Sequence, residues 1–84
     1  MPVELRDEVS IATSDLGSVL LDERSGKYWQ LNRSGALILD VLLQGRSLAD
    51  AAQAVVERYR VDRERADADA KALLEQLRAG GLVS

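Results

Sequence analysis

The sequence contains no cysteine, no histidine and no phenylalanine among its 84 residues. Without cysteine and histidine the chain has no disulfide framework, no thiolate nucleophile and no imidazole to bind a metal or move a proton near neutral pH. Asp67 and Asp69 are a possible carboxylate pair. Two residues apart on a helix, however, they point about 200° from each other, and we interpret them as surface charges. We therefore expect a protein that is not an enzyme and needs no cofactor or metal.

Long apolar runs are also missing. A helix that spans a bilayer needs about 20 consecutive apolar residues, and no stretch of the chain approaches that length. Charged side chains occupy most of positions 4–8, where a signal peptide would need an apolar run. We expect a cytoplasmic protein with no membrane partner.

Basic residues are fewer than acidic ones: the chain has 11 basic and 14 acidic side chains and a net charge of −3. Non-specific binding to nucleic acid depends on Lys and Arg displacing counterions from phosphates, so we expect no nucleic-acid partner. A chain of this size buries only about 60–65% of the surface that its unfolded form exposes. This is enough for one modest core, and we predict a single domain over residues 1–84.

The first half of the chain follows the two-residue period of β-strands. The pattern predicts strands at 9–13, 18–23 and 27–31, separated by short polar or glycine-containing turns. Because connections this short join neighbouring antiparallel strands, the three strands should form a meander.

Alternation along the third predicted strand separates its side chains onto two faces. Trp29 and Leu31 share one face, and Tyr28 and Gln30 share the other. A chain without phenylalanine needs its one large ring for packing, so we place Trp29 in the core. Tyr28, on the opposite face, is better suited to meet a partner.

The second half of the chain has a helical period. Asn32 is a good N-cap for a helix predicted over 33–43, and Gly45 follows where a left-handed residue ends many helices. Ser47, with Asp50 three residues later, indicates the start of a second helix.

Asp62 stands as the N-cap of a third helix, predicted over 63–79, after which two glycines stop it and Leu82 and Val83 return to the core. The fold class we predict is α+β. It consists of a three-stranded antiparallel β-meander followed by three helices, similar to a winged helix-turn-helix.

The third strand should lie at an edge of the sheet, where it presents a row of unpaired N–H and C=O groups. Lys27 is its only protective residue. Such an edge favours strand addition, in which an extended peptide pairs with the sheet through its main chain. The alternative is that the third helix already covers this edge.

The third helix has a thin apolar stripe, with the small residues Ala66 and Ala70 where leucine or valine is usual. Small residues there allow either close packing of the helix against the sheet or a shallow trough left open for a ligand. In the second case Leu73 and Leu74 would continue the trough, and Asp69 on its flank could meet a basic or hydroxyl group of the ligand.

Four stretches of the chain resemble the PqqD family. Residues 27–39 (KYWQLNRSGALIL) look like its aromatic strand followed by Leu-Asn and a small-residue helix start. Residues 45–50 resemble its turn into the second helix, and residues 59–62 and 73–83 resemble its third helix and Gly-Leu ending. The likeness extends over nearly the whole chain from Val9 onward.

The resemblance implies that the chain recognises the leader segment of a ribosomally made precursor peptide, bound as an added strand between the third strand and the third helix. A free-standing domain of this size looks most like the leader-binding protein of lasso-peptide pathways. Its partners would be a separate cysteine protease and an ATP-dependent cyclase. The resulting candidate peptide-binding residues are Lys27, Tyr28, Trp29, Gln30, Leu31, Ala66, Asp69, Ala70, Leu73 and Leu74.

Three alternatives remain at this stage. Within the family, the chain could be a PqqD-type peptide chaperone that serves a radical enzyme in quinone-cofactor synthesis. It could also be a winged-helix DNA-binding regulator, although four acidic residues against two arginines at the start of the third helix oppose contact with phosphate. A purely structural dimer that shares its edge strand is the third.

Overall fold

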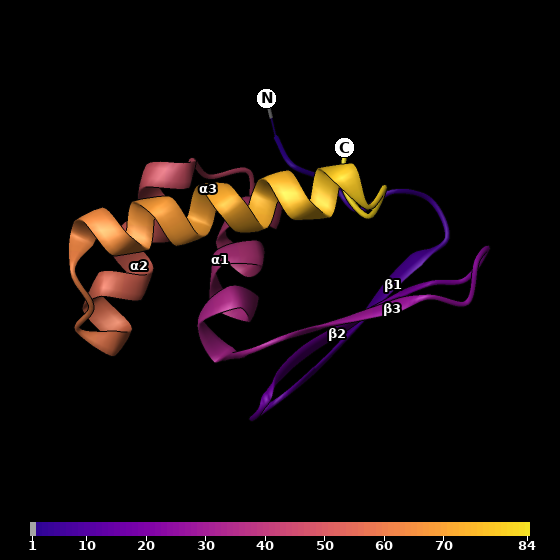
Figure 1. Cartoon of the computed structure of the whole chain (residues 1–84), viewed down its shortest axis with the longest axis horizontal. Helices are drawn as coiled ribbons and strands as arrows, with labels where there is room; N and C mark the ends of the chain where they lie inside the picture. The colour runs from indigo at the N-terminus through magenta and orange to yellow at the C-terminus, as the bar shows by residue number, and fades with distance from the viewer. Residues whose placement is uncertain (1) are drawn as a thin grey trace.

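The computed structural model describes residues 2–84 and consists of three strands followed by three helices (Figure 1). The prediction of an α+β fold is confirmed, and the first and third helices have the predicted bounds. The elements are β1 (Val9–Ser14), β2 (Gly17–Asp22), β3 (Tyr28–Leu31), α1 (Arg33–Leu43), α2 (Leu48–Tyr59) and α3 (Arg63–Ala79).

The three strands form one antiparallel sheet in the order β1-β2-β3, which confirms the meander. Leu20 of β2 lies opposite Trp29 of β3 and is fully buried, so this pair marks the face of the sheet that packs on the helices. Tyr28 and Gln30 are exposed on the other face. The predicted alternation of β3 is therefore confirmed.

The hairpin between β2 and β3 differs slightly from the prediction, because β3 begins at Tyr28 and not at Lys27. Lys27 closes the hairpin instead, with its carbonyl accepting a hydrogen bond from the Asp22 N–H at 2.9 Å. At the start of β2, Gly17 has a φ of 137°, and a Cβ there would overlap the Leu31 carbonyl oxygen. Only glycine lets β2 approach the end of β3 so closely.

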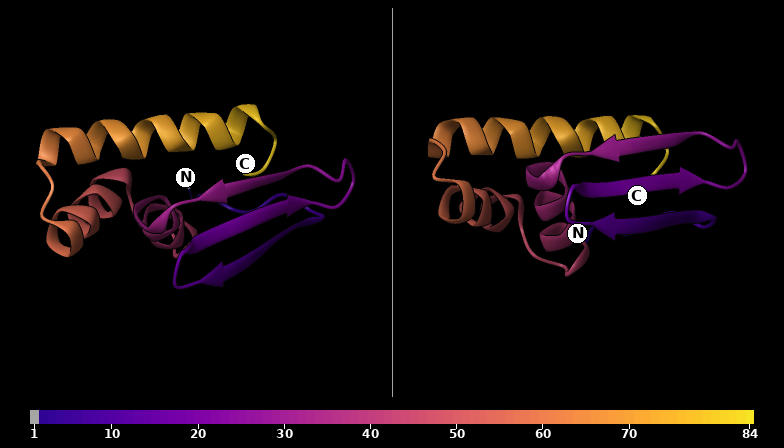
Figure 2. Two further views of the ribbon diagram at one scale, coloured as in Figure 1. Left: turned by 60° about the horizontal axis from the view of Figure 1, so that its bottom comes forward. Right: turned by 90° about the horizontal axis from the view of Figure 1, so that it is seen from below.

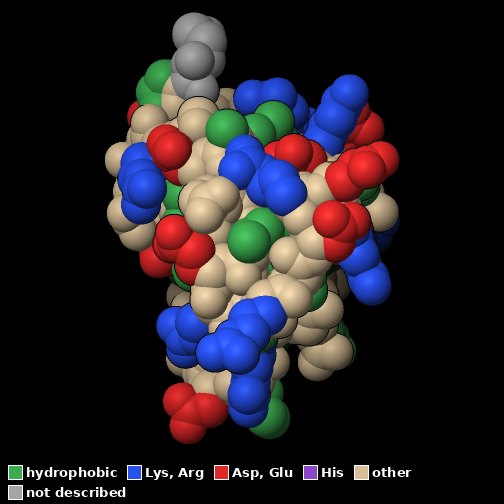
Figure 3. Space-filling model, turned by 90° about the vertical axis from the view of Figure 1, so that its left-hand side faces the viewer, with side chains coloured by type: hydrophobic (Ala, Val, Ile, Leu, Met, Phe, Trp, Pro, Cys, Tyr) green, Lys and Arg blue, Asp and Glu red, His purple; other side chains and the backbone are tan. Residues whose placement is uncertain are grey.

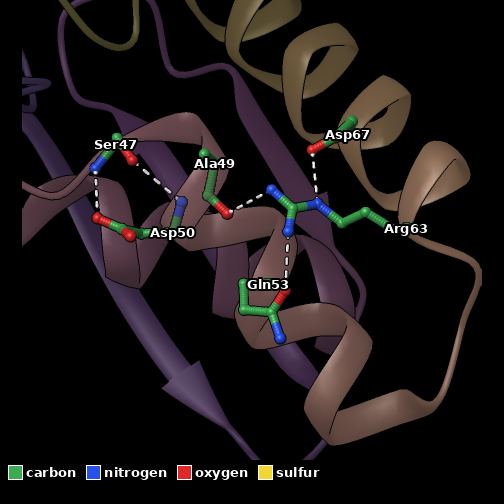
Figure 4. Close-up of polar contacts among 6 residues, drawn as sticks. All are labelled: Ser47, Ala49, Asp50, Gln53, Arg63 and Asp67. Carbon is green, nitrogen blue, oxygen red and sulfur yellow. Dashed lines mark hydrogen bonds and ion pairs between the residues drawn. The ribbon is translucent and has the colours of Figure 1, made fainter.

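Side-chain caps fix where α1 and α2 begin, as the sequence predicts. The Gly35 N–H donates to the Asn32 Oδ1 at 2.8 Å. Ser47 and Asp50 form a reciprocal capping box, with N–H to side-chain oxygen distances of 3.0 and 3.2 Å (Figure 4). Asp62 occupies the N-cap position of α3, but its side chain makes no capping hydrogen bond.

Arg63 ties the start of α3 to α2. Its guanidinium donates to the Gln53 Oε1 at 2.8 Å and to the Ala49 carbonyl at 3.3 Å, and it pairs with Asp67 one turn along α3 at 3.1 Å (Figure 4). These contacts set the direction in which α3 leaves α2 and returns toward the sheet.

The two ends of the chain close the core together. Leu82 and Val83 are buried, as predicted. A feature that the sequence did not suggest is that the N-terminal segment pairs with them, because the Arg6 N–H donates to the Leu82 carbonyl at 3.0 Å and Leu5 bridges to Val83.

The path of α3 brings it alongside the sheet. In both views of Figure 2, β3 is the strand nearest to α3, and β1 lies on the far edge. The edge of β3 therefore lies on the side of the sheet toward α3.

Candidate functional site

The outer edge of β3 carries main-chain groups that no strand within residues 2–84 pairs with. The bond from the Asp22 N–H to the Lys27 carbonyl fixes the alternation of the antiparallel ladder. In such a ladder every second residue bonds to the neighbouring strand. Trp29 and Leu31 therefore bond to β2, whereas Tyr28 and Gln30 direct their N–H and C=O groups away from the sheet.

A groove of about 350 Å³ lies beside this edge, between the end of β3, the first turns of α1 and the middle of α3. It is open to solvent and borders the unpaired edge of β3. Its lining residues are Gln30, Leu31, Asn32, Ser34, Gly35, Ile38, Asp69, Leu73 and Gln76.

The floor of the groove is apolar and depends on a glycine. A Cβ at Gly35 would lie 3.5 Å from the Leu31 Cβ and 3.7 Å from the Leu73 Cδ2, so these three residues meet at the base. The same Cβ would lie 3.2 Å from the Asn32 Oδ1, so a side chain at position 35 has little room.

The rim of the groove is polar. Asp69 and Gln76 stand on the α3 side, and Gln30 and Asn32 stand opposite them. Asp69 is exposed and lies 3.8 Å from Arg65, an exposed ion pair that solvent screens. Of the two flanks of α3, the one that carries Asp69, Leu73 and Gln76 lines the groove.

The aromatic residues of β3 are placed as predicted from their alternation. Trp29 is half-buried and packs against the core. Its ring lies against Gly80 at the end of α3, where an added Cβ would come within 3.1 Å of the Trp29 Cζ2. Tyr28, 65% exposed, stands on the opposite face of the sheet, and Lys27 is exposed beside the hairpin.

The structure corrects the expectation of an open trough on the alanine stripe of α3. Ala66 and Ala70 have no exposed surface, and Leu74 is 5% exposed. All three side chains pack into the core, and the small size of the two alanines permits close approach of the helix. Of the α3 residues predicted to meet a peptide, Asp69 and Leu73 line the groove.

Five groove residues were not predicted from the sequence: Asn32, Ser34, Gly35, Ile38 and Gln76. The first four belong to the start of α1. The sequence patterns that indicated the site, the alternation of β3 and the apolar stripe of α3, contain no information about this segment. The glycine at the third position of α1 could have indicated this part of the site. Glycine lowers the stability of a helix, so its presence there suggests that a larger side chain does not fit.

Within residues 2–84, no cluster of His, Cys, Asp and Glu side chains has the composition to hold a metal ion. The same part of the chain has no helix whose length and apolar character would let it cross a bilayer.

Comparison with known proteins adds a family and two solved structures. The family model described as Coenzyme PQQ synthesis protein D (PqqD) matches residues 17–83. The chain is 46% identical to a structure described as "Lasso peptide synthetase B1 complexed with the leader peptide", with a TM-score of 0.90 over 100% of this chain and 99% of that chain. It is 28% identical to "TbiB1 in Complex with the TbiA(beta) Leader Peptide", with a TM-score of 0.84 over 96% and 94%. No curated protein matches the chain.

Proposed function

Because this chain belongs to the PqqD family, we propose that it binds the leader segment of a ribosomally synthesised precursor peptide by strand addition to β3. The observation that carries the proposal is the unpaired edge at Tyr28 and Gln30, which lies directly beside the groove against α3. The two solved relatives, both described as complexes with leader peptides, support it.

The edge and the groove have different tasks in this proposal. Main-chain hydrogen bonds to β3 provide affinity for any extended peptide, and they are blind to sequence. Side chains of an added strand alternate between its two faces, so every second one enters the groove. The apolar floor at Leu31 and Leu73 selects an aliphatic or aromatic leader residue, and Asp69 on the rim selects a basic or hydroxyl-bearing one.

We further propose that the protein acts in lasso-peptide biosynthesis as a single non-catalytic domain. It holds the leader so that the following core segment is available to a separate cysteine protease and an ATP-dependent cyclase. The 46% identity to a lasso peptide synthetase B1 over the whole chain supports this pathway. The description of the matching family favours one alternative, a peptide chaperone for a radical enzyme in quinone-cofactor synthesis.

Calorimetric titration with the leader of the precursor encoded beside this gene tests the proposal. A scrambled peptide of the same composition is the control. We expect saturable binding of the leader and clearly weaker binding of the scrambled peptide, which keeps only the main-chain contribution, whereas equal binding of both would refute a sequence-selective site. Mass spectrometry of the unlabelled precursor incubated with the protein alone should show no change, and any cleavage would overturn the non-catalytic role.

A further inference from the structure

A second pocket, of about 520 Å³, lies beyond the end of β3, between the β1–β2 turn and the ends of α1 and α2. Two arginines, Arg33 from the first turn of α1 and Arg58 from the last turn of α2, line it together with Tyr59. Figure 3 views this end of the molecule, where Lys and Arg side chains gather toward the β1–β2 turn at the bottom. The proposed function does not use this pocket.

The two arginines have unused hydrogen-bonding capacity. The Arg33 Nε donates to the Asp15 carbonyl at 2.6 Å, which holds the guanidinium in place while its terminal nitrogens stay available. Within residues 2–84, neither Arg33 nor Arg58 forms an ion pair, although Asp15 and Glu57 are near. Asp15 also lines the pocket, but within the described residues no ion pair joins its carboxylate to either guanidinium. Both guanidiniums therefore keep donors that suit an anionic group, because the planar guanidinium matches a carboxylate closely.

A third hollow adjoins both the arginine pocket and the groove beside β3. This hollow shares Gln30, Leu31 and Asn32 with the groove, and it shares Ser14 and Gly17 with the arginine pocket. Leu16, 79% exposed at the tip of the β1–β2 turn, lines this hollow. The three hollows therefore follow one another from the edge of β3, past an exposed leucine, to the two arginines.

We propose that the bound precursor peptide continues beyond the Leu31 end of β3 along these hollows and places an Asp or Glu side chain between Arg33 and Arg58. This inference rests on the proposed function and adds a second recognition site to it. The charge of the site is opposite to that of the molecule as a whole, which is −3. It therefore distinguishes an acidic segment from the rest of the peptide, and an apolar residue before the acid contacts Leu16.

Matched synthetic peptides test this proposal. Each consists of the leader used above, a Gly-Ser spacer and a terminal Glu-Glu or Gln-Gln, added in one series at the N-terminus and in another at the C-terminus. An extended residue spans at most about 3.5 Å, and the intermediate dimension of the molecule is 28 Å. Spacers of about two to about eight residues therefore cover every distance from the strand to the pocket.

We expect the Glu-Glu peptide to bind about threefold to tenfold more tightly than its Gln-Gln partner in one of the two series, as two partly exposed ion pairs would give. The variant with Arg33→Gln and Arg58→Gln should lose this preference and keep the affinity for the unextended leader. Lys71→Gln, which removes one positive charge from the exposed face of α3, should keep both. Arg58→Glu should also abolish the preference, because the new carboxylate can pair with Arg33.

A Glu-Glu preference absent from every spacer in both series would overturn the arginine site, as would a preference that survives in the double variant. These outcomes differ from a failure of the proposed function, because in that case the unextended leader would not bind at all.

Discussion

At the scale of single residues, Gly35 determines the depth of the groove. We predict that Gly35→Ala weakens leader binding, because the added methyl would stand 3.2 Å from the Asn32 Oδ1 and 3.7 Å from the Leu73 Cδ2. Alanine is favoured over glycine inside a helix by about 1 kcal/mol, which offsets the tight contact with the capping Asn32 Oδ1, so stability should change little. Titration and thermal unfolding of the same variant separate the two effects. A variant with full affinity would show that the peptide does not reach the base of the groove.

For Ala70 we expect the opposite result, a loss of stability with little change in leader affinity. Because it is fully buried, Ala70→Leu should lower the free energy of unfolding by about 1–3 kcal/mol through overpacking. Leader affinity, measured at a temperature where the variant is folded, should stay close to that of the original chain. Chemical denaturation and calorimetry provide the two values, and reduced affinity with unchanged stability would restore the trough that the sequence suggested.

These two residues also show what sequence patterns resolve at this scale. Strand alternation has only two outcomes, so the orientations of Trp29 and Tyr28 followed directly. A stripe of alanines on a helix is compatible with close packing or with an open surface. Both produce the same sequence pattern, so the sequence alone cannot distinguish them. The role of Gly35 depends on contacts between the start of α1 and α3. Such tertiary contacts produce no periodic pattern in the sequence.

At the scale of elements, strand addition requires main-chain N–H groups of β3 that do not bond to β2. Proline at Tyr28 or Gln30 removes an outward N–H and should abolish leader binding without breaking the ladder to β2. Proline at Ile11, an outward position on β1, is the matched control and should leave binding intact. Circular dichroism verifies that each variant is folded, and binding that persists in both folded β3 variants would exclude pairing along this edge.

The elements themselves could be predicted almost entirely, because local interactions determine their ends. Asn32 and the Ser47–Asp50 box start their helices through contacts within three residues. The pairing of the N-terminal segment with Leu82 and Val83 was not predictable, because it joins residues about 80 positions apart and the segment is too short to show alternation.

At the scale of the whole molecule, two carboxylates make the free energy of unfolding depend on pH in the acidic range. Hydrogen bonds from the Ser47 main chain and side chain lower the pKa of Asp50 below its ordinary 3.8, and the Arg24 N–H does the same for the pKa of Asp22. A lowered pKa in the folded state means that the stabilisation is complete above the unfolded pKa and is lost as pH falls through the folded one.

Thermal unfolding should therefore occur at lower temperature as pH decreases from 3.8 downward. Asp50→Asn should reduce this dependence, since amide nitrogen and oxygen do not titrate there. Melting curves across this range for both proteins provide the comparison. An identical pH dependence in the variant would show that the capping box contributes nothing to acid sensitivity.

Amide hydrogen exchange, followed by NMR with and without the leader, tests the central claim that the leader adds to β3. The account predicts that exchange at Tyr28 and Gln30 slows on binding, because their outward N–H groups gain main-chain acceptors. Trp29 and Leu31, already bonded to β2, and Ile11 on the far edge should change little. Slowed exchange at Ile11 with none at Tyr28 and Gln30, or saturation by the leader without protection at either residue, would contradict it.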